Sequence, residues 1–238
     1  MSQTHTIHSH PGQSPQSSWS ILYEDGDILV CAKPHGLPVQ SRRAGSPDLE
    51  SLLKTHLVRQ GQKPYLAVIH RLDQPVSGLL VFGKTKKSAS SLNAQLTGGS
   101  FGKHYRALVD RCPPAPSGTL QDYLVKDGRS NTSRVCSPDT PGAKKAALEY
   151  RTVSGESSFF PDAKEGQTEL EIHLLTGRHH QIRVQLAHLG CPLAGDTKYN
   201  PSALSPGSWQ VLKLCAFRLE FLHPVTGKKM QFCLERDV

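Results

Sequence analysis

The stretch HRLDQPVSGLLVFGK, residues 70–84, places a dense cluster of charged residues directly before an apolar run. The run from Gly78 to Phe82 predicts a buried strand, because an uninterrupted apolar segment of this length is typical of a strand covered on both faces. An Asp and an Arg at the rim of such a strand form either a structural ion pair or a site held on a rigid element. The residues alone leave both interpretations open.

The segments that flank this strand predict a hairpin before it and a helix after it. Residues 21–34, ILYEDGDILVCAKP, contain two apolar runs around an Asp-Gly turn, which is typical of a strand hairpin that ends at Pro34. After the strand, Thr85 is placed to cap a helix that the glycines at 98–99 end. One face of this helix is apolar and consists of Ala89, Leu92 and Leu96.

The second half of the chain predicts further strands and one helix. Its strand patterns lie at residues 105–109, 146–153, 169–175 and, in the tail, on either side of a turn at residues 223–227. Residues 179–189 predict a helix that ends at Gly190, with Ile182, Leu186 and Leu189 facing inward. Residues 111–118 and 125–145 are rich in proline and turn residues and predict surface loops. Many strands with few helices indicate the α+β class.

The overall composition narrows the class of protein. A formal net charge of +8 over 238 residues favours an anionic partner, usually nucleic acid, although an ordinary basic protein has the same balance. No apolar run is long enough to span a bilayer, and the first residues have neither a basic nor an apolar signal region. The six cysteines include no C-x-x-C pair, so neither a zinc site nor a compact disulfide framework is indicated. We expect a soluble, cytoplasmic protein with reduced thiols and no membrane association.

Residues 1–18 differ in composition from the rest of the chain. They are rich in Ser, Gln, His and Pro and lack apolar periodicity, which predicts a disordered N-terminal tail. His5, His8 and His10 raise a metal hypothesis, but no Cys or carboxylate accompanies them. We therefore expect no dedicated metal site in this tail.

Four segments, in order, resemble the RluA-like family of RNA pseudouridine synthases. The pattern H-R-L-D-x-x-x-S-G-L-L followed by Lys84 resembles the family's central motif, and residues 21–39 resemble its first motif. KHYRALV, residues 103–109, is similar to the segment that supplies the active-site tyrosine. GRHHQIRVQLAHLGCPLAGDTKY, residues 177–199, is similar to the segment that supplies the arginine. The closing LEFLHPVTGKKMQF also fits the family pattern.

The resemblance implies a fold and a reaction. The fold is a mixed, largely antiparallel central sheet flanked by helices and loops, formed by residues 19–238 as one catalytic domain. A basic catalytic cleft across the sheet is expected to hold Asp73 near its floor. The reaction is the isomerisation of specific uridines to pseudouridine in ribosomal RNA, transfer RNA or both, without a cofactor or a metal.

The resemblance also implies roles for three catalytic residues. Asp73 is the catalytic carboxylate, which either adds to C1′ of the sugar or assists the proton abstraction that leads to a glycal. Arg183 matches the arginine that orients this carboxylate and favours its charged form. Tyr105 matches the tyrosine that stacks on the target base and takes the proton from C5 in the last step.

Basic residues within the same motifs are candidates for RNA binding. Because the target nucleotide must leave the stack, Arg71 is the candidate that occupies the vacated space. The candidates for phosphate contacts are Lys33, Lys84, Lys103 and Arg178. For His70 we expect structural hydrogen bonding, and for His179 and His180 loop packing, since no third metal ligand lies at a suitable spacing.

Three positions depart from the family pattern. Val76 and His179 stand where Thr is usual, and Gln185 stands where His is common, which concerns local hydrogen bonding and substrate preference rather than the reaction. The small N-terminal RNA-binding domain of many relatives is not recognisable, so we expect recognition by the catalytic domain itself. We expect a monomer with RNA as partner and no obligate protein partner. The alternatives are a non-catalytic RNA-binding or RNA-chaperone protein of the same fold and a metal-dependent nucleic-acid hydrolase, which requires clustered carboxylates.

Overall fold

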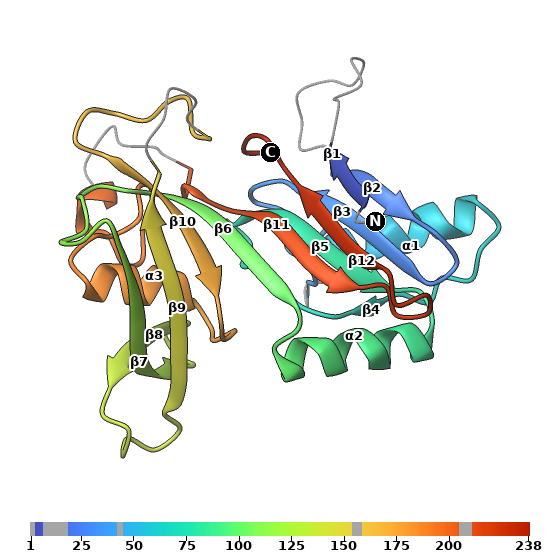
Figure 1. Ribbon diagram of the computed structural model, residues 1–238, viewed down its shortest axis with the longest axis horizontal. Helices are drawn as coiled ribbons and strands as arrows, with labels where there is room; N and C mark the ends of the chain where they lie inside the picture. The colour runs from blue at the N-terminus through green and yellow to red at the C-terminus, as the bar shows by residue number, and fades with distance from the viewer. Residues whose placement is uncertain (1–2, 7–18, 42–44, 154–158, 205–210) are drawn as a thin grey trace. The chain divides into compact units, whose positions relative to one another are not determined.

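The structure is a computed structural model that describes residues 3–6, 19–41, 45–153, 159–204 and 211–238 (Figure 1). The chain divides into two compact units. The first unit combines Met1–Gly102 with Ala216–Val238, and the second unit consists of Lys103–Cys215. One catalytic domain over residues 19–238 stays a prediction.

The first unit is built on a sheet whose two central strands are completely buried. The strands β2 (Ser20–Glu24), β3 (Ile28–Lys33), β5 (Ser77–Gly83) and β11 (Leu214–Leu222) follow one another in this order. β12 (Lys229–Cys233) pairs with β11, and β4 (Ala67–Val68) pairs with β5, both antiparallel. The predicted hairpin around the Asp-Gly turn and the predicted apolar strand are confirmed as β2, β3 and β5.

The part of the first unit that the structure describes contains two helices. α2 (Lys86–Gly98) begins after Thr85, whose side chain accepts a hydrogen bond from Ser88 N, and ends at Gly99 with a left-handed φ of 79°. This confirms the predicted helix, although Leu96 is only half-buried. α1 (Leu49–Arg59) was not predicted. Asp48 caps it by accepting from Ser51 N, and Leu49, Leu53 and Leu57 are fully buried along one face.

Among its described residues, the second unit contains an antiparallel sheet and one α-helix. The strands β6 (Gly102–Val109), β10 (Thr168–Leu174), β9 (Lys144–Thr152), β7 (Ser117–Asp127) and β8 (Thr132–Cys136) follow one another in this order. The helix α3 (Gln181–His188) follows β10, and a short 3-10 helix, η1 (Pro201–Leu204), comes later. The predicted helix and strands of this half are confirmed, with Leu189 half-buried just beyond α3.

The predicted loop over residues 125–145 is wrong. β8 lies inside it, and β7 and β9 extend into it from either side, with Val125 opposite Arg134 in register. A half-exposed ribbon needs few apolar side chains, so turn residues dominate its composition. Leu124, Ala146 and Val184 form the buried cluster that holds the ribbon to α3, and Val135 packs against it. The predicted loop at residues 111–118 is shorter than expected, because β7 already begins at Ser117.

Part of the predicted disordered tail has regular structure. Gln3–Thr6 form β1, which pairs in parallel with β12. An unpaired strand edge offers backbone donors and acceptors to any added strand, whatever its side chains, which explains why a polar segment is ordered there. His8 and His10 lie outside the described residues.

The α+β class with a mixed sheet is confirmed. Among the described residues, no helix combines the length and the apolar character that crossing a membrane requires.

Candidate functional site

Asp73 lies in a tight turn immediately before β5. Val76 N donates to the Asp73 carbonyl oxygen at 3.0 Å, which closes the turn around Gln74 and Pro75. The Asp73 side chain is half-buried, whereas the neighbouring Arg71 is exposed. The charged cluster therefore sits on a rigid turn at the rim of a buried strand.

The segment after β3 lies against this turn. Gly36 N donates to the Gln74 carbonyl oxygen at 3.0 Å, and the Gln74 side chain donates back to the Gly36 carbonyl oxygen at 2.9 Å. Gly36 has a left-handed φ of 78°, which favours glycine at this position. The first and the central sequence motifs are thus hydrogen-bonded to each other.

Lys33 is part of this arrangement and is fully buried. Its ammonium group donates to the carbonyl oxygens of Pro34, Leu37 and Gln74 at 2.9, 2.8 and 3.1 Å. Three carbonyl oxygens match the three N–H donors of an ammonium group. The expected phosphate contact of Lys33 is therefore corrected, since its charge is used inside the fold.

Lys84 is corrected for the same reason. Its side chain is 8% exposed, and its ammonium group lies 2.7 Å from a carboxylate oxygen of Glu24 and 2.5 Å from the Asp25 carbonyl oxygen. Glu24 also accepts from His56 at 2.9 Å. Lys84 thus joins β5 to the β2–β3 hairpin instead of facing solvent.

Gly78 fixes how closely β5 approaches β11. Its φ is +119°, and a Cβ atom at this position would lie 2.5 Å from the backbone nitrogen and oxygen of Ala216. Only a residue without a side chain fits against that backbone. Packing against Ala216 therefore explains the glycine of the central motif.

Tyr105 and Lys103 project from one face of the second unit's sheet. The register places Tyr105 opposite Ile172, and Ile172 opposite Tyr150, so all three side chains share the face that also carries Ala146 and packs on α3. Tyr105 is 6% exposed and Lys103 is 8% exposed. Burial, and to a smaller extent the positive charge of Arg178, lower the pKa of Lys103. The prediction that Lys103 contacts phosphate at the surface is therefore corrected, because the side chain is buried. Arg178 is exposed, as a phosphate contact requires.

Arg183 is buried on α3 and is held by two side chains that were not predicted as site residues. Its Nε and one terminal nitrogen donate to the two carboxylate oxygens of Asp196 at 2.8 and 2.6 Å. Its guanidinium carbon lies 5.2 Å from the centre of the Tyr199 ring. Asp196 and Tyr199 belong to the same GDTKY segment that carries the family resemblance, so position in the motif was the available signal.

His179 and His180 lie at the start of α3. Their rings stack with centroids 3.8 Å apart, and Nδ1 of His180 lies 2.7 Å from the Tyr199 hydroxyl. Because Ser133 N donates to the same hydroxyl oxygen, the phenol proton is available to the imidazole. Burial and the nearby charge of Arg183 lower the pKa of His180 to about 3. In the first unit, the His70 ring packs edge-on against Phe101.

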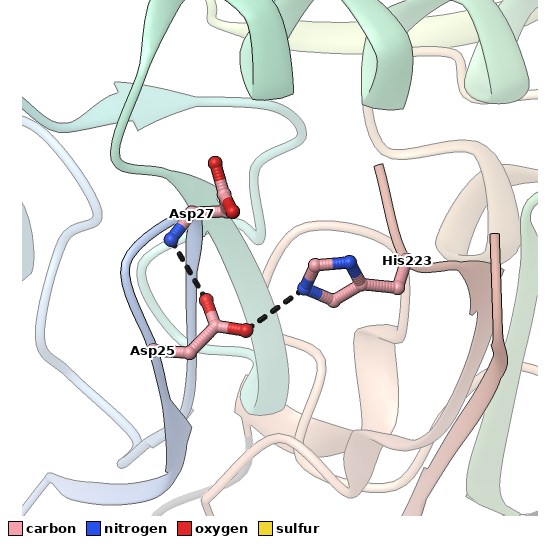
Figure 2. A group of neighbouring side chains, drawn as sticks. All are labelled: Asp25, Asp27 and His223. Atoms are coloured by element: carbon pink, nitrogen blue, oxygen red, sulfur yellow. Dashed lines mark hydrogen bonds and ion pairs between the residues drawn. The ribbon is translucent and has the colours of Figure 1, made fainter. Parts of the chain in front are cut away.

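Within the described residues, one group of side chains has the spacing of a metal site: Asp25, Asp27 and His223 (Figure 2). Its hydrogen bonds provide a different explanation. Asp25 accepts from the backbone nitrogens of Asp27 and Ile28 at 2.8 Å and from His223 Nε2 at 2.8 Å. Nδ1 of His223 accepts from Val225 N and Thr226 N, so the ring proton is on Nε2, where a metal would have to bind.

The protonation of Asp25 agrees with this assignment. Burial alone would raise the pKa of Asp25, but the hydrogen bonds from Ile28, Asp27 and His223 hold it below its usual value. The hydrogen bond between His223 and Asp25 therefore connects the β11–β12 turn to the β2–β3 turn. These hydrogen bonds explain the cluster as a structural feature, and the cluster gives no support to the alternative of a metal-dependent hydrolase.

The proposed site residues are distributed over both units. The first unit carries Asp73 and Arg71, and the second unit carries Tyr105, Arg183 and Arg178. The turn that carries Asp73 is held by Lys33 and Gly36, and Arg183 is held by Asp196, which is the kind of support that a reactive group needs.

Comparison with known proteins gives a consistent result. Residues 27–188 match the model of the RNA pseudouridylate synthase family. The chain is 34% identical to ribosomal large subunit pseudouridine synthase D of Vibrio cholerae, covering 90% of this chain and 66% of that protein. It is 31% identical to an RNA pseudouridine synthase of Bacillus subtilis, covering 87% of this chain and 65% of that protein. The chain thus spans about two thirds of the length of these curated relatives.

Solved structures support the same fold. The human protein RNA pseudouridylate synthase domain containing 1 superposes with a TM-score of 0.71 at 22% identity, covering 94% of this chain and 85% of that chain. A second human protein, RNA pseudouridylate synthase domain containing 4, gives a TM-score of 0.68 at 24% identity, with coverages of 89% and 86%.

Proposed function

This chain belongs to the RNA pseudouridylate synthase family, and on that premise we propose that it isomerises uridine to pseudouridine in RNA. The observation that carries the proposal is the family match over residues 27–188, which includes Asp73, Tyr105 and Arg183. The matched residues belong to both compact units. We therefore propose that residues 19–238 act together as one catalytic domain.

The proposed chemistry assigns one task to each of three side chains. The Asp73 carboxylate attacks C1′ of the sugar or assists glycal formation, and the N1–C1′ bond breaks. The uracil then turns so that C5 joins C1′, which releases the carboxylate on the addition route. The Arg183 guanidinium favours the charged form of this carboxylate. Tyr105 stacks on the base and accepts the C5 proton at the end. The reaction is an isomerisation and needs neither an oxidant nor an energy source.

The proposed substrate is ribosomal RNA, with transfer RNA as the other candidate. Several relatives are named ribosomal large subunit pseudouridine synthase, which supports the first choice. The exposed side chains of Arg71 and Arg178 are the proposed RNA contacts, Arg71 in the space that the flipped nucleotide leaves. We propose that the protein acts in the cytoplasm as a monomer.

The experiment that tests this function is a modification map. RNA from cells with and without the gene is treated with a carbodiimide that labels pseudouridine and is read by primer extension. The expected result is the loss of one or a few defined stops without the gene. The wild-type gene restores them and Asp73→Asn does not, because an amide is a far weaker nucleophile and base than a carboxylate.

A matched variant controls for unspecific loss of activity. Asp139→Asn removes a carboxylate from an exposed turn of the second unit and is expected to restore the stops. Asp73→Asn should bind RNA and unfold like the wild type. Full restoration by Asp73→Asn would overturn the assignment of the carboxylate, and unchanged stops without the gene would favour a protein that only binds RNA.

A further inference from the structure

The turn that carries Asp73 has a second anchor, which joins two of the sequence motifs to the end of the segment that follows β12, through Asp237. Asp73 is on neither a strand nor a helix, so the position of its carboxylate depends on what holds residues 73–76. One anchor is the backbone of Gly36 together with Lys33. The other is formed by His35, Ser77 and Asp237, which come from three separate parts of the first unit.

His35 bridges the turn and the last residues of the chain. Its Nδ1 lies 2.8 Å from the Pro75 carbonyl oxygen, and its Nε2 lies 2.8 Å from Oδ2 of Asp237. Oδ1 of Asp237 accepts a short hydrogen bond from the hydroxyl of Ser77, which is fully buried. Asp237 thus connects the residue after the turn to the imidazole that holds the turn itself.

Both ring nitrogens of His35 face oxygen atoms. The Pro75 carbonyl oxygen only accepts hydrogen bonds, and an ionised carboxylate likewise only accepts. His35 therefore joins the turn to Asp237 through contacts at both of its ring nitrogens. The side chains are 21% and 17% exposed, so the pair is shielded from solvent more than an ordinary surface pair. Lys33 is also bonded to the turn, and its ammonium group donates to carbonyl oxygens.

We propose that His35 and Asp237 are positioning residues that hold the Asp73 turn in its reactive geometry. This inference rests on the proposed function, because it matters for catalysis only if Asp73 is the reactive carboxylate. A displacement of about 1 Å at a reacting group costs about a hundredfold in rate. His35, Asp237 and Ser77 thus form a clamp, and the clamp acts on the turn through Pro75 and Ser77.

The first measurement is the kinetics of His35→Ala, Asp237→Asn and the double variant on a transcript that contains the mapped uridine. We expect kcat to fall between about 10-fold and about 100-fold with little change in KM, because the turn moves while the RNA contacts remain. The double variant should be no slower than the slower single variant, since both changes open the same clamp. Asp237→Glu, which keeps the carboxylate, should recover part of the loss.

The second measurement needs no RNA. Hydrogen exchange of the wild type and the two single variants reports how well the Val76 amide is protected. We expect faster exchange over residues 73–77 in both variants, with exchange elsewhere in the first unit unchanged.

A chemically matched pair in the same unit provides the control. His56 and Glu24 lie 2.9 Å apart with side chains 26% and 15% exposed, close to the values for His35 and Asp237. His56→Ala should leave kcat and the exchange of residues 73–77 unchanged.

The two proposals fail in different ways. Unchanged kcat and unchanged exchange in His35→Ala, or a loss of kcat equal to that of His56→Ala, would overturn the clamp. If the wild type makes no pseudouridine, the proposed function fails, but the clamp can still be tested by hydrogen exchange. Faster exchange over residues 73–77 in the variants would support the clamp, and unchanged exchange would overturn it.

Discussion

Arg183 and Asp196 form a bidentate ion pair in which both side chains are buried, with 5% and 0% exposed. Asp196 also accepts hydrogen bonds from the backbone nitrogens of Lys198 and Tyr199 at 3.0 and 3.3 Å. The carboxylate therefore fixes the guanidinium on one side and the loop that carries Tyr199 on the other. Two N–H···O bonds in one plane leave the guanidinium little rotational freedom.

Asp196→Asn tests this pair. An amide cannot accept both hydrogen bonds from Arg183 and leaves a buried positive charge uncompensated, so we expect the free energy of unfolding to fall by about 3 kcal/mol. Urea unfolding measures the loss. The control is Asp162→Asn, because Asp162 is 63% exposed in its pair with Lys213 and such pairs contribute at most about 1 kcal/mol. Equal effects of the two variants would contradict the proposed role of Asp196.

Tyr105→Phe tests the final proton transfer. The ring remains and can still stack on a base, but the hydroxyl that accepts the proton is gone, so product formation should fall by at least about a hundredfold. Nucleoside analysis of a transcript with one target uridine measures the product, and RNA binding should be unchanged. Tyr150→Phe is the control, since Tyr150 is buried on the same face of the sheet. A normal product yield from Tyr105→Phe would remove Tyr105 from the proposed mechanism.

Local signals explain which parts of the fold were predictable. The Asp-Gly turn between β2 and β3, the Thr85 cap and the left-handed Gly99 each act within a few residues, and the corresponding elements were predicted correctly. α1 is missing from the prediction, although Asp48 and the four-residue spacing of its buried leucines carry the same kind of signal. The β7–β8 ribbon was missed because its strands are held by neighbouring strands and α3 rather than by their own apolar pattern.

Distant partners explain what was not predictable at the site. Lys33 donates to Gln74, 41 residues away, and His35 contacts Asp237, 202 residues away. A basic residue in a motif looks the same in the sequence whether its charge meets a phosphate or three carbonyl oxygens. The assignment of Lys33 and Lys84 to RNA binding failed for this reason, whereas the motif that contains Asp73 could be recognised from its order of residues alone.

Lys33→Met tests whether the buried ammonium group is structural. Methionine has a similar length but no donors, so the Pro34 and Leu37 carbonyl oxygens lose the hydrogen bond from Lys33, while the Gln74 carbonyl oxygen keeps the one from Gly36 N. Each unsatisfied buried group costs about 1 to 3 kcal/mol, and we expect a destabilisation of at least about 2 kcal/mol in urea unfolding. Lys86→Met, at an exposed position at the start of α2, should change the free energy of unfolding by at most about 0.5 kcal/mol. A stability unchanged from the wild type, with weaker RNA binding, would restore Lys33 as a phosphate contact.

The depressed pKa of His180 predicts how stability depends on pH. In the folded protein the pKa is about 3, because burial and Arg183 disfavour the charged ring, whereas an unfolded chain has a histidine pKa near 6.5. The unfolded state therefore binds the proton first, so the contribution of His180 is complete above pH 6.5 and is lost as the pH falls from 6.5 towards 3. Between pH 7.5 and pH 5 we expect a loss of about 2 kcal/mol from this residue.

His180→Asn isolates this contribution from the other titrating groups. Asn tolerates the left-handed backbone of this position, where φ is 53°, and does not titrate. Urea unfolding at pH 7.5 and pH 5 should show that the variant loses about 2 kcal/mol less than the wild type over this interval. The variant should also start from a lower stability at pH 7.5, because the contact with the Tyr199 hydroxyl is removed. An identical pH dependence in both proteins would mean that His180 takes up its proton in the folded state, which the buried, positively charged surroundings of its ring oppose.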